Sequence, residues 1–318
     1  MKLVHVAVAV LFDQQSRIVI ARRPEHVHQG GLLEFPGGKV EAGEELPEAL
    51  VREMKEELGV DVTASPMRPL IRIEHQYVDK HVYLDVWVVQ GYVGELHGRE
   101  GQEVYLYDID DLKPEDFPAA NKAIIDALKL PARCLITGPF HGPEEVQRKL
   151  RYAADRGVTM AVLRAPELSQ QDYRHWAESI INQWHREFPI LLVHGASGLA
   201  LINNTSLPVD GCHLNSAQLK SLERRPLPPE YWLGASCHNL HELDKAAQLG
   251  CRYGFISPVN ATQSHTGVQG IGWEAFAELT RRASFPVFGL GGLKDEDIQQ
   301  AQWSGGQGVA AISAWWQC

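Results

Sequence analysis

Residues 38–60 read GKVEAGEELPEALVREMKEELGV, and this stretch decides the fold of the first part of the chain. A helix is expected over Pro47–Leu58, because it begins with proline and is followed at once by glycine. Within it, Leu50, Met54 and Leu58 recur at helical spacing and form an apolar stripe. The stripe predicts a helix that packs against a core.

The same helix carries a group of acidic side chains. Glu53, Glu56 and Glu57 fall on an arc of about 100° beside the apolar stripe. Three carboxylates on one arc repel each other unless a cation lies among them, and oxygen ligands favour Mg²⁺ or Mn²⁺. The glycines Gly37 and Gly38 precede the helix and let the backbone approach a ligand closely. The pattern predicts a metal site for a multiply charged substrate.

This segment resembles the Nudix box, G-x5-E-x7-R-E-U-x-E-E-x-G-U, in which U is a bulky aliphatic residue. Every fixed position is matched, by Gly38, Glu44, Arg52, Glu53, Glu56, Glu57, Gly59 and Val60. Met54 is a small departure, because isoleucine, leucine or valine is usual at its position. The resemblance implies metal-dependent hydrolysis of a nucleoside diphosphate linked to a further group.

A closer resemblance, to the MutT-type 8-oxo-dGTP diphosphatases, extends over nearly all of residues 1–130. It is carried by Arg22-Arg23, LEFPGGK at 33–39, Gly94-Glu95, GREGQ at 98–102 and DFPAAN at 116–121. Enzymes of that family release the nucleoside monophosphate and pyrophosphate from an oxidised nucleotide, which removes it from the nucleotide pool. The catalytic residues that the resemblance implies are Arg52, Glu53, Glu56, Glu57 and Glu100, and the metal site is implied at Gly38, Glu53, Glu56, Glu57 and Glu100.

The substrate-binding residues that this resemblance implies are Arg23, His28, Glu34, Phe35, Tyr77 and Asn121. Asn121 would hydrogen-bond the oxidised purine, because its amide offers both a donor and an acceptor and oxidation at C8 turns N7 into a donor. Phe35 and Tyr77 would line the base pocket, and Arg23 would contact the phosphate or sugar with His28 nearby. Structural alternatives stay open, since Asn121 could cap a helix and the two aromatic residues could belong to the core.

The second part of the chain, residues 133–318, has a different pattern of apolar residues. Eight short apolar runs alternate with helical patterns, which argues for a (β/α)₈ barrel, with a doubly wound open sheet as the alternative. We therefore expect an α/β protein with two domains. Residues 1–130 form a Nudix α/β/α sandwich with a mixed sheet, residues 133–318 form the barrel, and a short linker joins them.

Residues 133–318 are similar to the thiamine phosphate synthase and TenI (thiazole tautomerase) barrels. The resemblance is carried by GVT at 157–159, VDGCHL at 209–214, GASCH at 234–238, SPV at 257–259 and GLGG at 289–292. It implies a phosphate site at Gly291, Gly292 and Ser313, and an acid/base role for His238 in the tautomerase-like branch, with Arg164 as a further site residue.

This part of the chain departs from the synthase pattern at four places. His194-Gly195 stands where an Asn-Asp pair holds Mg²⁺ and pyrophosphate, and residues 215–218 (NSAQ) lack the expected acidic residue. Pro166 and residues 262–265 (TQSH) stand where the pattern has lysines. Pyrophosphate displacement is therefore not expected. The barrel is expected to bind a phosphorylated thiamine-pathway ligand, to regulate the hydrolase or to be vestigial, with tautomerase chemistry as an alternative.

Composition limits the remaining possibilities. The chain has 318 residues and a formal net charge of −10, which argues against a nucleic-acid duplex as partner. No apolar run reaches the roughly 18 residues of a transmembrane helix, and no signal peptide is expected. The five cysteines are scattered, as is typical of a reducing cytoplasm. A small nucleotide is the expected substrate, with a thiamine-pathway pyrophosphate as the alternative.

Overall fold

The computed structural model describes residues 3–25, 29–76, 81–204, 206–261 and 269–318. The chain divides into two compact units, residues 1–129 and 130–318. None of the helices within these described ranges is long and apolar enough to cross a membrane.

The first unit is built on one mixed sheet. Its strands are β1 (Leu3–Phe12), β2 (Ile18–Arg22), β3 (Leu33–Glu34), β4 (Gly37–Lys39), β5 (Met67–Gln76), β6 (His81–Gln90) and β7 (Val104–Tyr107). The order is β3-β2-β1-β6-β5, with β4 beside β1 and β7 beside β2. The pair β1 and β6 is parallel and the other pairs are antiparallel. The mixed sheet is the one that the sequence predicted.

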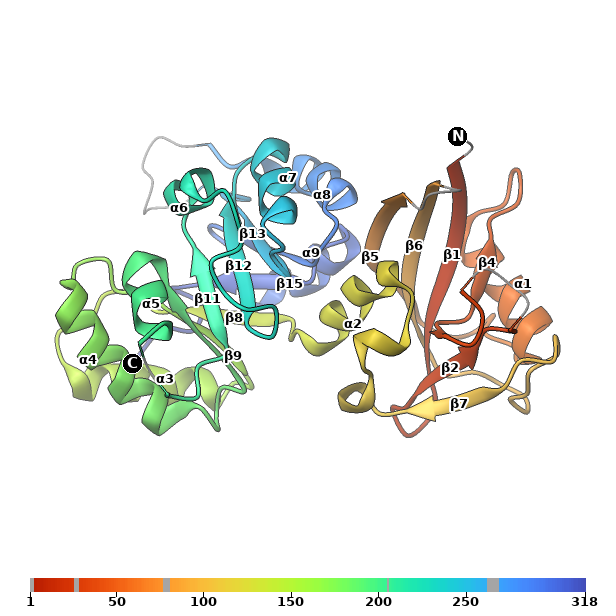
Figure 1. Cartoon of the computed structure of the whole chain (residues 1–318), viewed down its shortest axis with the longest axis horizontal. Coiled ribbons are helices and arrows are strands. Elements are labelled where there is room, and N and C mark those ends of the chain that lie inside the picture. Colours follow the sequence, from red (N-terminus) through yellow and green to blue (C-terminus); the bar gives the residue numbers. More distant parts are fainter. Residues whose placement is uncertain (1–2, 26–28, 77–80, 205, 262–268) are drawn as a thin grey trace. The chain divides into compact units, whose positions relative to one another are not determined.

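Helices cover both faces of this sheet (Figure 1). On one face, Ala7, Ala9 and Leu11 of β1 pack with the buried side of α1 (Leu46–Leu58). On the other face, the alternate β1 residues pack with α2 (Lys122–Lys129). This period-two alternation produces two cores and an α/β/α sandwich. The helix predicted at residues 47–58 is confirmed.

Two expected elements differ in the structure. The sequence predicts a helix over residues 119–128. In the structure this segment begins as a 3₁₀ turn over Ala119–Asn121 and becomes α-helical only at Lys122. Two more 3₁₀ turns, Ile109–Asp111 and Pro114–Asp116, lead into it. The β-branched and aromatic run at residues 82–93 predicts one long strand, and in the structure this strand, β6, ends at Gln90.

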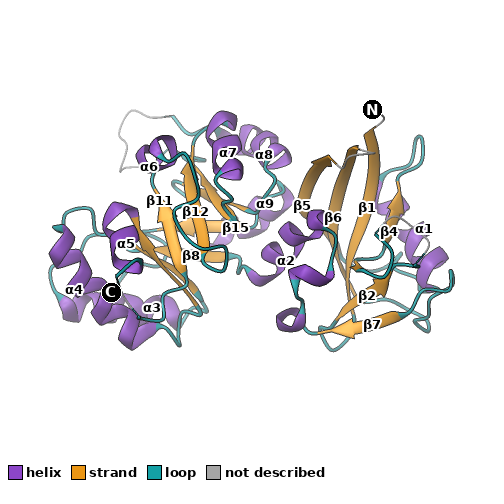
Figure 2. Cartoon of the chain, viewed as in Figure 1, coloured by secondary structure: helices purple, strands orange, loops and turns teal. Residues whose placement is uncertain are grey.

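The second unit is a closed barrel of eight parallel strands, so the (β/α)₈ prediction is confirmed and the open sheet is excluded. The strands are β8 (Arg133–Ile136), β9 (Met160–Leu163), β10 (Ile190–His194), β11 (Gly211–Leu214), β12 (Trp232–Cys237), β13 (Tyr253–Ile256), β14 (Val287–Leu290) and β15 (Gly308–Ala311). Its helices are α3 (Pro143–Ala154), α4 (Gln170–Trp184), α5 (Gly195–Ile202), α6 (Ser216–Ser221), α7 (Leu240–Gln248), α8 (Gly272–Arg282) and α9 (Ile298–Trp303), with a 3₁₀ turn at Asp295–Asp297 (Figure 2).

The barrel interior is filled by side chains. Met160, Val162, Leu192, Phe255 and Phe288 belong to one inner cluster, while alternate residues of the same strands face the helices. A glycine makes room for the largest inner residue, because a Cβ at position 234 would lie 2.0 Å from the Tyr253 ring. The core is packed, and ligands are expected at the loops that follow the carboxyl ends of the strands.

Candidate active site

The acidic helix α1 is fixed at both ends and along its buried side. At its start, the Glu45 N–H donates to the Glu48 carboxylate at 3.0 Å, which satisfies a backbone group that the helix leaves free. At its end, Gly59 adopts φ +73°, a conformation that glycine accepts without strain. Leu50 and Met54 are fully buried against the sheet. The glutamates on the adjoining arc therefore keep a fixed position relative to β4.

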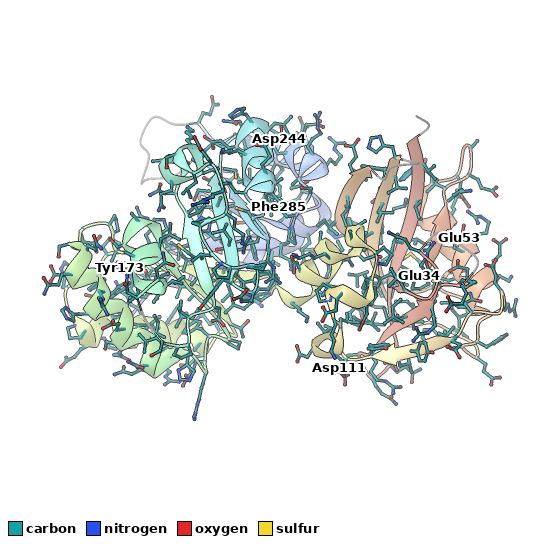
Figure 3. The ribbon with its side chains drawn as sticks, in the orientation of Figure 1. Glu34, Glu53, Asp111, Tyr173, Asp244 and Phe285 are labelled. Atoms are coloured by element: carbon teal, nitrogen blue, oxygen red, sulfur yellow. The ribbon has the colours of Figure 1, made fainter. Side chains whose placement is uncertain are left out.

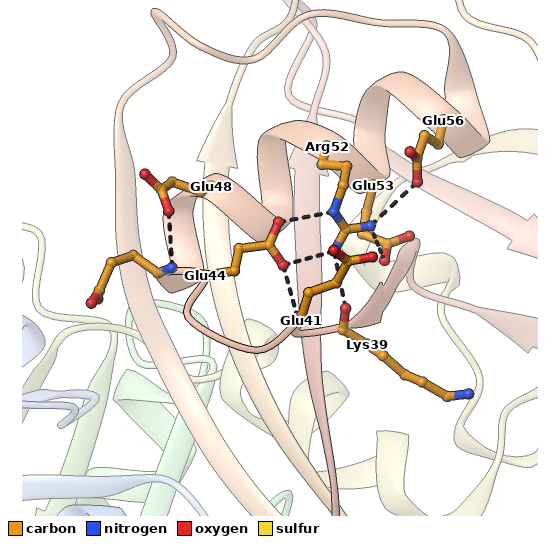
Figure 4. Close-up of polar contacts among 8 residues, drawn as sticks. Lys39, Glu41, Glu44, Glu48, Arg52, Glu53 and Glu56 are labelled. Carbon is orange, nitrogen blue, oxygen red and sulfur yellow. Dashed lines mark hydrogen bonds and ion pairs between the residues drawn. The ribbon is translucent and has the colours of Figure 1, made fainter.

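Arg52 joins this helix to the loop before it (Figure 4). Its Nε and Nη2 donate to the two Glu44 oxygens at 2.8 Å each, and Nη2 also donates to the Lys39 carbonyl at 3.0 Å. Its Nη1 donates to Glu53 at 2.7 Å and to Glu56 at 3.3 Å. These bonds lower the pKa of Glu44 to about 2, and they raise the pKa of Arg52. Bidentate pairs of this kind are among the strong charge-assisted bonds in proteins.

The backbone of Gly37 and Gly38 contacts the glutamates of α1. The Gly37 N–H donates to Glu57 Oε2 at 3.1 Å. A Cβ at position 38 would lie 2.1 Å from Glu53 Oε1, so a larger residue there would displace the Glu53 carboxylate. The pKa of Glu57 is raised to about 8, chiefly by burial and then by the charges of Glu34, Glu53 and Glu100, against the lowering effect of the Gly37 bond. Burial also raises the pKa of Glu53.

Glu100 reaches this group from a loop beyond α1. The loop is tied to the end of the helix, since the Arg99 N–H and the Gln102 side-chain amide both donate to the Glu57 carbonyl, at 2.8 and 3.1 Å. The Glu100 N–H donates to the Gln102 side chain at 2.8 Å. Glu100 itself is exposed, yet its charge contributes to the raised pKa values of Glu34, Glu53 and Glu57. The carboxylates from three segments therefore act on one another.

These carboxylates suit a hard divalent cation in chemistry and charge. Among the described residues, no three histidine, cysteine, aspartate or glutamate side chains already converge into a metal-binding cluster. Mg²⁺ does not require such a cage, because it keeps several waters and binds through one or two carboxylates together with substrate phosphates. The pKa of Glu57 is raised first by burial and then by repulsion from Glu34, Glu53 and Glu100, and a bound cation would offset both effects.

A pocket of about 240 Å³ adjoins the carboxylates. Its lining comes from β1, β3, β4, β6 and the turn before α2, and consists of Val6, Val8, Arg23, Gln29, Glu34, Phe35, Gly37, Gly38, Lys39, Val82, Leu84, Pro118, Ala120 and Asn121. Glu34 and Glu53 are labelled in Figure 3. Arg23 forms an ion pair with Glu34, while burial raises the pKa of that carboxyl. The structure thus brings four of the predicted substrate-binding residues to one pocket.

The aromatic and amide residues of the pocket are both buried. Phe35 is 4% exposed and stacks on Phe117 with ring centroids 5.4 Å apart. Asn121 is 7% exposed, and within the described part of the chain its side-chain amide forms no hydrogen bond. The helix-capping alternative is therefore not seen in the described residues, and the amide is free to face a ligand. His28 and Tyr77 lie outside the described residues.

Gln29 also lines this pocket, and it was not among the residues predicted from the sequence. It adopts φ +59°, which is uncommon for a residue other than glycine. Strained backbone conformations of this kind cluster at functional sites. Only the neighbouring pair Gly30-Gly31 could have signalled an unusual turn here. Gln29 offers a second amide in the pocket that holds Asn121.

The predicted residues of the barrel lie after the carboxyl ends of four different strands. Arg164 follows β9, His238 follows β12, and Gly291 and Gly292 follow β14 with φ of +103° and +63°. The sequence predicts that Ser313 ends the eighth strand, but β15 ends at Ala311, and Ser313 is an exposed residue two positions beyond it. The structure therefore distributes these residues around one end of the barrel.

His194, which replaces the first residue of the expected Asn-Asp pair, lies at the end of β10. Burial lowers its pKa to about 4, with the charge of Arg164 adding to the effect. A neutral imidazole in this place does not supply the carboxylate that a Mg²⁺-pyrophosphate complex needs. The second lysine position, in residues 262–265, lies outside the described residues.

Glu57 determines a pH dependence that can be measured. In the metal-free folded chain it keeps its proton up to about pH 8, whereas its ordinary pKa is 4.5. The unfolded chain loses this proton first, so the free energy of unfolding of the first unit falls as pH rises from about 4.5 to about 8. Hydrogen exchange of β1, followed in denaturant with a chelator that keeps the chain metal-free, measures this free energy of unfolding at each pH. We expect the free energy of unfolding to fall less with pH in Glu57→Gln than in the unchanged chain. Equal slopes in the two proteins would contradict the raised pKa of Glu57.

Comparison with known proteins places each unit. Residues 7–127 match the family model described as NUDIX domain, and residues 133–315 match the model described as Thiamine monophosphate synthase. Over 129 residues, the chain is 37% identical to an Escherichia coli protein named 8-oxo-dGTP diphosphatase, covering 41% of this chain and 98% of the relative.

The second unit has its own relatives. Over 184 residues, the chain is 30% identical to a Synechococcus protein named thiamine-phosphate synthase, covering 57% of this chain and 51% of that relative. The chain thus spans about half the length of this relative. For the first unit, a solved structure from a study of MutT of Aliivibrio salmonicida and Vibrio cholerae is 36% identical, with a TM-score of 0.35, and covers 40% of this chain and 97% of that chain.

Proposed function

The chain belongs to the Nudix hydrolases through its first unit and to the thiamine monophosphate synthase family through its second, and from this we propose that the first unit hydrolyses 8-oxo-dGTP to the nucleoside monophosphate and pyrophosphate. This activity would remove oxidised guanine nucleotides before they are incorporated into DNA. It rests on the curated relatives of the first unit and on the geometry of the pocket.

One observation supports the proposal above the others. Strand β4 contributes Gly37 and Gly38 to the lining of the pocket, and the same glycines contact Glu57 and Glu53. A base held in the pocket would therefore direct its phosphates toward the carboxylates of α1. Holding the reacting groups in place in this way is a large part of catalysis.

The metal-binding residues that we propose are Gly38, through its carbonyl, and Glu53, Glu56, Glu57 and Glu100. Divalent ions such as Mg²⁺ or Mn²⁺, when bound, would neutralise charge on the phosphate oxygens and lower the pKa of an attacking water. In this proposal Arg52 is a positioning residue, because its bonds hold Glu44, Glu53 and Glu56 around the loop.

The attacking water needs a proton acceptor. We assign this role to one of Glu53, Glu57 and Glu100, whose oxygens would hold the water and accept its proton. Glu57 is the strongest candidate of the three, because burial raises its pKa and makes it a stronger base than an exposed carboxylate. A pKa near the working pH suits general base catalysis.

Base recognition in this proposal depends on Asn121 and Gln29. Each amide offers one acceptor and two donors, so together they can match the altered edge of an oxidised purine. Phe35 provides an apolar wall, and Arg23 would meet the sugar or phosphate. A buried site that hydrogen-bonds one edge rejects a base that leaves those groups unpaired.

The test is pyrophosphate release by the full chain with Mg²⁺ from 8-oxo-dGTP, dGTP and a pyrimidine pyrophosphate of the thiamine pathway, each at low concentration. We expect kcat/KM for 8-oxo-dGTP to exceed that for dGTP about a hundredfold or more, which is about 2.7 kcal/mol of discrimination. Comparable weak rates for both purines with rapid turnover of the pyrimidine compound would contradict the proposal and favour a thiamine-pathway substrate.

For the barrel we propose binding of a small phosphorylated ligand of the thiamine pathway. The supporting observation is the pair Gly291-Gly292 after β14, whose positive φ values suit glycine and leave no side chain between the backbone and a ligand. A change in the rate of 8-oxo-dGTP hydrolysis on adding thiamine phosphate would support a regulatory role. The absence of both heat of binding and rate change would contradict it. Proton transfer by His238, as in a thiazole tautomerase, is the alternative activity of this unit.

A further inference from the structure

A serine and a histidine meet at the carboxyl ends of two neighbouring barrel strands. Ser216 is the first residue of α6, just after β11, and His238 directly follows β12. Because β11 and β12 are paired along their length, the two loops are adjacent. The Ser216 hydroxyl lies 3.0 Å from Nε2 of His238. Ser216 falls in the segment that lacks the acidic residue of the synthase pattern.

The protonation of His238 follows from its second contact. Its Nδ1 lies 2.7 Å from the backbone carbonyl oxygen of Ser257, and a carbonyl oxygen can only accept a hydrogen bond. The proton of the neutral imidazole therefore resides on Nδ1, and the lone pair of Nε2 points at Ser216. The serine hydroxyl lies 3.0 Å from that lone pair and 3.4 Å from the Ser236 carbonyl oxygen, and we place its proton on the shorter contact, to Nε2. This is the orientation in which an imidazole removes a proton from a hydroxyl nucleophile.

The two loops that carry the pair are held in place by buried charge. The His238 backbone N–H donates to Glu242 at 2.8 Å, and Glu242 is only 3% exposed. Lys220 of α6 forms an ion pair with the same carboxylate of α7 at 3.0 Å. Asn215 and Asn239 cap the two helices through their side chains. The separation of Ser216 and His238 is thus set by the packing of α6 against α7.

The pair remains open to ligands. His238 is exposed and Ser216 is half-buried, so a substrate can reach both groups. A nucleophile hydrogen-bonded to a base, with the base oriented by a third group, is the arrangement of acyl-transfer enzymes. Here the third group is the Ser257 carbonyl oxygen in place of a carboxylate.

We propose that Ser216 and His238 form a nucleophile and base pair that hydrolyses small carboxylic esters in the barrel. This activity belongs to the second unit and does not depend on the proposed function of the first. Neither the synthase pattern nor an acid/base role of His238 alone includes a serine nucleophile.

The reaction balances with water as the only co-reactant. Ser216 Oγ forms a bond to the acyl carbon, and its proton passes to His238 Nε2. The bond from the acyl carbon to the alcohol oxygen breaks, and that oxygen takes the proton from Nε2 as the alcohol leaves. Water then attacks the acyl carbon and gives one proton to Nε2, the acid is released, and the proton returns to Ser216 Oγ.

The experiment is covalent labelling of the full-length chain with an alkyl fluorophosphonate, which transfers its phosphonyl group to an activated serine and releases fluoride. Intact mass gives the extent of labelling and peptide mapping gives its position. We expect one adduct, on Ser216, formed about a hundredfold more slowly in His238→Gln and absent in Ser216→Ala. Ester turnover is measured in parallel with 4-nitrophenyl acetate.

Ser221→Ala is the matched control, because Ser221 ends the same helix and its hydroxyl donates only to the Gln218 carbonyl. It should label and hydrolyse ester like the unchanged chain, and 8-oxo-dGTP turnover should be equal in all variants. An unlabelled Ser216 in the unchanged chain overturns the proposal, whatever the variants do. Labelling that is equally fast in a folded His238→Gln protein also overturns it.

Discussion

Glu57→Gln is expected to lower turnover of 8-oxo-dGTP by roughly 10²–10⁴-fold while the fold of the first unit stays intact. The lost group is a carboxylate that is mostly buried and adjoins Glu34, Glu53 and Glu100, so its charge cannot be replaced by solvent. Glutamine keeps the same shape, and its amide oxygen can still accept from the Gly37 N–H. Steady-state kinetics at saturating Mg²⁺ measures the loss of turnover. Hydrogen exchange of α1 measures whether the fold of the first unit is intact.

The control for this change is Glu48→Gln. Glu48 lies in the first turn of the same helix and is exposed. Its carboxylate accepts a hydrogen bond from the Glu45 N–H, which glutamine can still accept. Its activity should stay within about twofold of the unchanged protein, as is usual for a surface substitution. Near-normal turnover in Glu57→Gln would remove this residue from the catalytic group and with it the proposed metal assignment.

Asn121→Ala is expected to abolish most of the preference for 8-oxo-dGTP over dGTP. The amide is 7% exposed, lines the pocket and forms no hydrogen bond within the described part of the chain, so its bonding capacity is available to the base. Losing it should reduce the ratio of kcat/KM values by about a hundredfold, or about 2.7 kcal/mol, chiefly through slower reaction of the oxidised nucleotide. Competition between the two nucleotides in one assay measures the ratio directly.

Lys122→Ala provides the comparison for that variant, because Lys122 is the next residue and is exposed. It should keep the full preference. A preserved preference in a folded Asn121→Ala protein would show that the base is read elsewhere in the pocket, and Gln29→Ala would then be the informative change. Equal loss of rate for both nucleotides would instead indicate a structural role for Asn121.

Local patterns predicted much of this fold. The limits of α1 follow from an apolar stripe and a terminal glycine, and they agree with the structure to within one residue. The eight barrel strands are short apolar runs separated by helices, so each is visible in sequence. Both cases depend on contacts between near neighbours and on burial of one face.

Other elements depend on pairing between distant segments. β5 (Met67–Gln76) was not predicted, because Arg68, Arg72 and Glu74 interrupt its apolar pattern. It forms by pairing with β6, and the register shifts between Pro69 and Ile71. The short helices α5 and α6 were missed as well, since neither is long enough to show a period.

The same distinction applies to the sites. The glutamates of α1 could be named because their spacing in the chain sets their spacing in space. Three other features could not be predicted from the sequence. They are the contact of Glu53 with the backbone at Gly38, the φ of Gln29 and the contact between Ser216 and His238. Each of these joins loops whose conformations are fixed by tertiary packing.

The guanidinium of Arg52 has no donor left for a substrate. Its five N–H groups are all engaged, by Glu44 twice, by Glu53, by Glu56 and by the Lys39 carbonyl. The charge of Arg52 is therefore used for bonds within the protein and not for binding a substrate. Under the proposed function, Arg52 would therefore not neutralise a bound polyphosphate. Divalent cations would supply that charge together with Arg23, and the rate would depend on the concentration of free cation as well as on that of the nucleotide.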